Sequence, residues 1–180
     1  MPNKEKNLSS EEIMSIEYIR GVQAEIDKNE TIKLLRSALA DEYNAMYAYW
    51  VQAKVIQGTE KEKIDKELYQ HRDEEMGHAN MLMDRILQLG GNPEIAPGKW
   101  NSLAGCDYAE LEYWDQKNIL DEALKGEYCA VKHYQKIADF VRNKDITTYD
   151  IVMKIISDEH EHIDDLSKLL ELVEKPKDQK

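Results

Sequence analysis

Two segments of this chain carry the same residue pattern at helical spacing, and this repeat constrains the fold more than any other feature. The pattern Ala-Leu-x-x-Glu-Tyr-x-Ala-x-x-x-Tyr begins at Ala38 and again at Ala123, 85 residues later. Apolar residues at these spacings form one face of an α-helix. The sequence therefore predicts two similar helical halves within one chain.

Each half continues with a second expected helix, which carries Glu-x-x-His. The motif spans Glu75 to His78 in the first half and Glu159 to His162 in the second, with apolar residues four and eight positions after each histidine. Because positions i and i+3 share a helix face, the glutamate and histidine of each motif project together.

Glycine and proline mark the ends of the expected helices. Helices are predicted over about 10–27, 30–57, 60–89, 115–142 and 147–173, and the turn-rich stretch 91–98 separates two pairs of them. This pattern resembles an all-α, ferritin-like four-helix bundle with one long crossover and an extra N-terminal helix. The expected parts are an N-terminal extension with a helix (1–29), the bundle (30–173) and a frayed tail (174–180).

The two repeats together predict a buried metal centre. A charged carboxylate within an apolar stripe is unfavourable unless it is paired or bound to a metal. Four such carboxylates in one core would repel each other, whereas two divalent cations would balance their charge. Oxygen and imidazole ligands suit iron, with manganese as the alternative. The predicted ligands match the ferritin-like dinuclear pattern: Glu42, Glu75, His78, Glu127, Glu159 and His162. The sequence does not assign the bridging glutamate.

Other polar residues fall close to these motifs. His71 lies four residues before Glu75 and shares its face, where it contacts the ligands, contacts an entering metal ion or packs as a structural histidine. Tyr49 and Tyr134 lie two turns from the carboxylates of their helices. Three roles stay open for each tyrosine: a hydrogen bond to a ligand, donation of one electron, or packing in the core. Two further histidines are expected to face solvent: His133 and His160.

The net charge of −12 limits the partners of the chain. Nucleic acids and anionic membranes need a basic face, whereas an acidic chain is suited to gathering cations. No apolar run approaches the ~20 residues that span a bilayer, and the polar start does not resemble a signal peptide. We therefore expect a cytoplasmic protein without membrane partners, in which Cys106 and Cys129 are reduced or redox-active.

The six predicted ligands resemble the ferroxidase centre of bacterioferritins, and longer stretches resemble the Dps-like proteins called thioferritins. These stretches are LADEYNAMYAYW, DEEMGHANMLMDRILQLGGNP and GEYCAVKHYQKIADF, and the likeness covers about residues 30–170. It implies a dodecameric homo-oligomeric cage in which each subunit binds two iron ions and oxidises Fe(II), preferably with hydrogen peroxide. It also implies storage of ferric mineral and protection against oxidative stress.

The resemblance further implies that Cys106 and Cys129 form a thiol–disulfide pair close to the metal centre. Spacing alone does not predict this pair, because Cys129 points roughly 200° around its helix from Glu127. Without the resemblance, both cysteines read as ordinary buried thiols.

Several other functions stay open. Met76 occupies the place at which bacterioferritins bind haem between subunits, although we expect it to pack at an interface and expect no haem. A peroxidase of the rubrerythrin or manganese-catalase kind would lack iron storage, but rubrerythrins usually carry Cys-x-x-Cys pairs, which this sequence lacks. A haem-binding cage and a bundle with a vestigial site are further alternatives. Lys4 and Lys6 are offset by nearby glutamates, so we expect little or no DNA binding.

Overall fold

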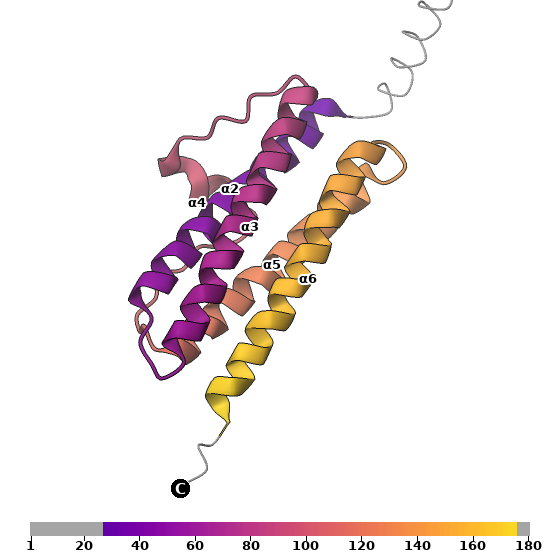
Figure 1. Ribbon diagram of the computed structural model, residues 1–180. Helices are drawn as coiled ribbons and strands as arrows, with labels where there is room; N and C mark the ends of the chain where they lie inside the picture. Colours follow the sequence, from indigo (N-terminus) through magenta and orange to yellow (C-terminus); the bar gives the residue numbers. More distant parts are fainter. Residues whose placement is uncertain (1–26, 176–180) are drawn as a thin grey trace, which may run out of the picture.

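The computed structural model describes residues 27–175, which form a bundle of four long helices (Figure 1). The helices are α2 (Lys28–Val55), α3 (Lys61–Gln88), α5 (Gln116–Val141) and α6 (Ile146–Glu174), and the long connection holds a 3-10 turn, η1 (Pro97–Lys99), and a short helix, α4 (Trp100–Leu103). The described part of the chain contains no strand. The predicted all-α, ferritin-like four-helix bundle is therefore confirmed. The extra N-terminal helix falls almost wholly outside the described residues, as does the tail after residue 175.

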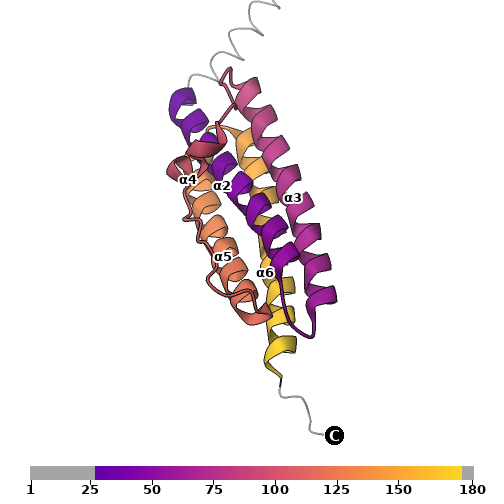
Figure 2. The same ribbon diagram turned by 90° about the vertical axis from the view of Figure 1, so that its left-hand side faces the viewer.

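The long helices pack as two pairs. Helix α2 packs against α3 and α5 against α6, and contacts of α2 with α5 and of α3 with α6 join the pairs (Figures 1 and 2). Short turns over 56–60 and 142–145 link the helices within each pair. The single crossover, 89–115, connects the pairs and packs α4 against α2 (Figure 2). This connectivity is the one that the turn-rich stretch in the sequence predicted.

Two apolar clusters fill the bundle, and a polar layer separates them. The first cluster includes Leu35, Leu39, Leu82, Ile86, Ile137 and Ile155, and the second includes Ile56, Ile64, Leu68, Ile119, Leu120 and Leu166. On α3, for example, Glu75 and His78 lie between Leu68 of one cluster and Leu82 of the other. The predicted ligands therefore lie in a layer that is clamped by packed side chains on both sides.

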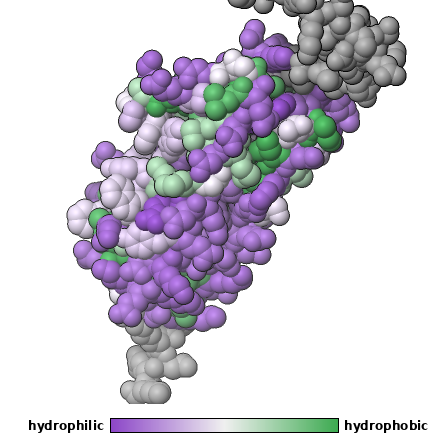
Figure 3. Space-filling view, turned by 45° about the horizontal axis from the view of Figure 1, so that its top comes forward, coloured by the Kyte–Doolittle hydropathy of each residue, from purple (hydrophilic) through white to green (hydrophobic). Residues whose placement is uncertain are grey.

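The surface contrasts with this interior. Hydrophilic side chains cover most of the face in Figure 3, with smaller apolar areas among them. Among the described helices, none combines the length and apolar character needed to cross a membrane. The apolar residues of the long helices are used chiefly to build the two clusters.

A largely buried ion pair ties the end of α3 to the start of α6. Arg85 donates to the two carboxylate oxygens of Asp145 at 2.8 and 2.7 Å and to the Thr148 hydroxyl at 2.8 Å. Asp145 is also the N-cap of α6, where its carboxylate accepts from the Thr148 amide. Burial raises the pKa of Asp145, but the hydrogen bonds from Thr148 and Arg85 outweigh burial and lower it. The carboxylate is therefore ionised at neutral pH.

We expect the Asp145→Ala variant to lose about 3 kcal/mol of unfolding free energy, because it removes a helix cap and leaves Arg85 without its partner. Urea unfolding followed by circular dichroism would measure the loss. The matched control is Asp150→Ala, an exposed aspartate of α6, which should change stability by less than about 0.5 kcal/mol. Equal stabilities of the two variants would contradict the role given to the ion pair.

Candidate metal centre

The structure brings all six predicted ligands together in the polar layer of the bundle. Helices α2 and α5 each contribute one glutamate, and α3 and α6 each contribute a glutamate and a histidine one turn apart. All six side chains are buried: Glu42, Glu75, His78, Glu127, Glu159 and His162. Four acidic side chains in one buried layer require a compensating positive charge.

The six side chains form two overlapping groups, each of which could hold one metal ion. In the first group, His78 Nδ1 lies 3.0 Å from Glu75, 3.3 Å from Glu159 and 3.5 Å from Glu42. One atom from each of these four residues lies within 4.8 Å of the others. The first group is therefore compact enough for its four members to coordinate a single cation.

The second group repeats the first with the roles of the two halves exchanged. His162 Nδ1 lies 3.1 Å from Glu159, 3.4 Å from Glu127 and 3.5 Å from Glu75. Glu75 and Glu159 therefore belong to both groups, whereas Glu42 and Glu127 each belong to one. This geometry favours Glu75 and Glu159 as the pair that bridges two ions, a choice that the sequence left open.

Two further carboxylates orient the histidines, and neither was among the predicted site residues. His78 Nε2 lies 3.2 Å from Asp158, and His162 Nε2 lies 2.7 Å from Glu74. A carboxylate on the outer nitrogen leaves the inner nitrogen free to bind a metal. The signal was present in the repeat, because an acidic residue directly precedes the motif glutamate in both halves.

Each buried tyrosine reaches across to the glutamate of the other half. Tyr49 of α2 donates a hydrogen bond to Glu127 of α5, and Tyr134 of α5 donates one to Glu42 of α2. Among the three roles weighed for these tyrosines, the structure places both as hydrogen-bond donors to predicted ligands. Burial and the neighbouring carboxylates raise the pKa of both phenols well above the usual value, so both hydroxyls carry their protons at neutral pH.

Without metal, the centre holds protons. Burial and the carboxylates of Glu159 and Glu42 raise the pKa of Glu75 well above its ordinary value. Burial and Glu159 raise the pKa of Glu127 to about 7. Cations that enter the centre therefore displace protons from these residues.

The pKa values of His78, His162 and Glu159 shift in the directions that favour charged imidazoles beside a charged carboxylate. Burial lowers the pKa of the His78 and His162 imidazoles, but the surrounding carboxylates outweigh burial and raise it. Burial likewise raises the pKa of Glu159, but the two histidines outweigh burial and lower it. In the metal-free centre, protonated histidines supply part of the positive charge that the glutamates need.

Several buried atoms of the centre have no hydrogen-bond partner. They are Glu42 Oε2, both carboxylate oxygens of Glu159, and His162 Nδ1. Buried polar atoms in native proteins are rarely unsatisfied, so each such atom needs an explanation. Two divalent cations would coordinate these atoms, and a donor set of carboxylate oxygens with two imidazoles suits iron or manganese. The residues present therefore fit a dinuclear metal centre.

His71 lies deep in the bundle beside the second group. Its ring stacks on His162, with ring centroids 4.1 Å apart, and meets Tyr49 edge-on at 5.4 Å. Burial and the neighbouring His162 lower the pKa of His71 to about 4. The imidazole is therefore neutral at pH 7 and lies against a predicted ligand.

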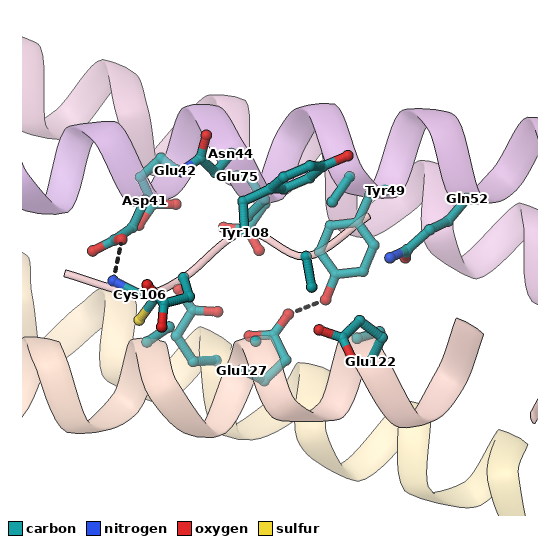
Figure 4. A pocket seen from close by; sticks show the side chains of 18 residues that line it. Asp41, Glu42, Asn44, Tyr49, Gln52, Glu75, Cys106, Tyr108, Glu122 and Glu127 are labelled. Atoms are coloured by element: carbon teal, nitrogen blue, oxygen red, sulfur yellow. Dashed lines mark hydrogen bonds between the residues drawn. The ribbon is translucent and has the colours of Figure 1, made fainter. Parts of the chain in front are cut away.

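A disulfide joins the crossover to α5 beside the centre. Cys106 and Cys129 are bonded, with Cα atoms 5.9 Å apart. The Cys106 amide donates to Asp41, the neighbour of Glu42, at 2.9 Å (Figure 4). The crossover segment is thus held on α5 by a covalent bond and on α2 by a hydrogen bond.

His133 is buried, so the prediction that it faces solvent is wrong. Its Nδ1 lies 2.5 Å from Asp41 Oδ2, and Gly105 packs so closely that a Cβ atom there would lie 2.4 Å from the ring. The crossover covers this side of α5, and helical periodicity carries no information about where a crossover runs. His160 is exposed, as predicted.

A cavity of about 90 Å³ lies between α2, α5 and the anchored crossover segment. The crossover contributes Cys106 and Tyr108 to its lining, while Glu75 and Glu127 reach it from the centre (Figure 4). This cavity gives a small molecule a place to meet the predicted ligands.

Met76 follows Glu75 on α3 but is not part of the centre. Its side chain is 48% exposed, on the outside of the bundle. The interface packing that we expect for Met76 and the alternative haem contact would both need a second subunit, so both stay predictions.

The family of the chain follows from comparison with known proteins. The family model for the ferritin-like domain matches residues 32–175, which include all six predicted ligands. The chain belongs to the ferritin-like family. A protein named DNA protection during starvation protein, from Pyrococcus furiosus, is 34% identical over 76% of this chain and 75% of its own length.

Two further relatives agree with the predicted resemblance to Dps-like proteins, thioferritins and bacterioferritins. A bacterioferritin from Rhodobacter capsulatus is 29% identical over 81% of this chain and 86% of its own length. The solved structure of a dodecameric, bacterioferritin-related thioferritin from Bacteroides fragilis superposes with a TM-score of 0.83 at 37% identity, covering 87% of this chain and 94% of that one.

Proposed function

We propose that this protein oxidises Fe(II) at a dinuclear centre within each subunit and stores the ferric product in a cage. The observation that carries the proposal is the pair of overlapping groups, in which Glu75 and Glu159 are shared and each histidine completes one group. Two equivalent positions side by side suit a reaction that removes one electron from each of two Fe(II) ions. Manganese remains the alternative metal.

The residues around the centre have distinct tasks in this proposal. The four glutamates would hold the two ions, and their combined charge of −4 would match two Fe(II) ions. Asp158 and Glu74 would keep the outer nitrogens of the two histidines protonated, so that the inner nitrogens stay available. The hydrogen bonds from Tyr49 and Tyr134 hold in place Glu127 and Glu42, the two glutamates that each belong to only one group.

Hydrogen peroxide is the proposed oxidant, as the resemblance to thioferritins implies. One peroxide takes one electron from each of two Fe(II) ions and two protons from solvent, and two water molecules result. The cavity beneath the crossover is the proposed entry point, because it reaches Glu75 and Glu127. Taking two electrons from neighbouring ions would avoid a free hydroxyl radical, which supports a role against oxidative stress.

Storage and assembly are proposed from the Bacteroides fragilis relative, which is dodecameric. The net charge of −12 supports an acidic cage that gathers cations and binds little or no DNA. Light scattering would give the particle size.

An anaerobic Fe(II) titration followed by peroxide tests the function. We expect a fast oxidation phase that saturates at two Fe(II) per subunit and consumes one peroxide per two Fe(II), followed by slower uptake of many more iron atoms per particle. Fast peroxide turnover without further uptake would instead identify a peroxidase. A Glu127→Ala variant that oxidises Fe(II) as fast as the wild type would refute the dinuclear centre.

A further inference from the structure

His71 is a member of two groups of possible metal ligands, and only one of them belongs to the dinuclear centre. One group combines His71 with Glu127 and His162, and the other combines it with Glu67 and Asp165. Glu67 lies one turn before His71 on α3, and Asp165 lies on α6. The second group therefore lies where α3 and α6 meet, and it shares only His71 with the first group.

The side chain of His71 is only 1% exposed, yet its ring nitrogens lack hydrogen-bond partners among the described residues. Among the described residues, its Nδ1 has no hydrogen-bond partner. Its Nε2 lies 3.6 Å from Glu67 Oε1, which is too long for a hydrogen bond. Stacking on His162 explains the position of the ring but leaves both nitrogens without a bond.

Of the two carboxylates of the outer group, only Asp165 forms an ion pair with a lysine or arginine among the described residues. Burial and the charges of Asp165 and Glu74 raise the pKa of Glu67, although Lys66 acts in the opposite direction. Lys168 pairs with Asp165 Oδ1 at 2.8 Å, but the lysine is exposed, and such pairs contribute little. The second oxygen of Asp165 is not used by that pair.

We propose that Glu67, His71 and Asp165 form a third divalent-cation site, separate from the dinuclear centre. One imidazole nitrogen and two carboxylates suit Fe(II), Mn(II), Co(II) or Zn(II). Glu67 and Asp165 are both partly exposed, whereas His71 is buried against His162. An ion bound here would lie between solvent and the dinuclear centre. A role for this ion in supplying the centre rests on the proposed function, whereas its binding does not.

Cobalt(II) binding measured by equilibrium dialysis and by visible absorption tests the site, because Co(II) reports its ligands without being oxidised by air at once. The test uses the full-length assembled protein with Co(II) alone. The Glu159→Gln background, in which the dinuclear centre is expected to be lost, isolates the third site. In this background we expect one Co(II) per subunit, and we expect His71→Gln to weaken its binding by at least about tenfold.

Two further variants complete the test of the third site. Glu67→Gln, which leaves the packing of His71 intact, should weaken the same ion. His160→Gln, which changes an exposed histidine on α6, should leave binding unchanged. If His71→Gln and Glu67→Gln alter neither the stoichiometry nor the absorption of Co(II) in the Glu159→Gln background, there is no third site. The proposed dinuclear centre is tested separately, by whether wild type binds two Co(II) more than Glu159→Gln.

Discussion

The Glu159→Gln variant is expected to lose tight binding of both ions of the dinuclear centre. Glu159 belongs to both groups, and neither of its oxygens has a hydrogen-bond partner in the metal-free protein. An amide supplies no negative charge and only one coordinating oxygen, so we expect affinity for Fe(II) or Co(II) to fall at least about 100-fold at both positions. The fast phase of Fe(II) oxidation should disappear with it.

A glutamate that belongs to only one of the two groups provides the comparison for this test. Glu42→Gln should weaken one ion much more than the other, because Glu42 belongs to a single group. Glu161→Gln, at an exposed position two residues after Glu159, should bind both ions as the wild type does. The assignment of Glu159 as a shared residue fails if its variant still binds one ion with wild-type affinity.

Metal removal is expected to lower the melting temperature, and the effect should grow with pH. With free metal at 100 times its dissociation constant, binding adds about 2.7 kcal/mol to stability, which corresponds to roughly 5–11 °C for a chain of this size. Differential scanning calorimetry of the metal-loaded and chelator-treated protein, at pH 5.5 and pH 8, would measure the difference.

The sign of the pH effect follows from Glu127. Its pKa in the folded, metal-free protein is raised to about 7 by burial and by Glu159. Below this pH the side chain is protonated and must lose its proton to bind a metal, so metal binding weakens as pH falls through 7. In the metal-free protein the same shift lowers stability as pH rises from about 4.5, the unfolded value, to 7. Both effects widen the gap between loaded and metal-free protein at high pH.

A variant without a titratable side chain at position 127 separates the contribution of Glu127 to the pH dependence from that of the other titratable groups. Glu127→Gln cannot titrate, so its gap in melting temperature should depend less on pH than that of the wild type. A wild-type gap that is as large at pH 5.5 as at pH 8 would contradict the assignment.

The helices and the six predicted ligands were accessible from sequence because both depend on local spacing. The duplication made the two Glu-x-x-His motifs mutually supporting, and a buried acidic layer followed from the apolar residues on either side of each glutamate. The family match and the bundle itself confirm the fold class.

The contacts that local spacing did not predict depend on where the chain lies in three dimensions. The burial of His133 depends on the course of the crossover, which no periodicity encodes. The Cys106–Cys129 bond depends on the same course, so only the resemblance to a family pointed to it. Asp158 and Glu74 were missed for a different reason: their acidic side chains, next to the motif glutamates, read as ordinary solvated positions until both histidines were seen to point at them.

The crossed hydrogen bonds of the two tyrosines make the chain behave as a covalently linked pair of protomers. Tyr49 of the first half steadies Glu127 of the second, and Tyr134 of the second steadies Glu42 of the first. Neither half contains a self-sufficient set of partners, so a small displacement of one helix disturbs the ligand environment of the opposite half. We therefore expect a substitution of either tyrosine to perturb the glutamate of the opposite half more than the glutamate of its own helix.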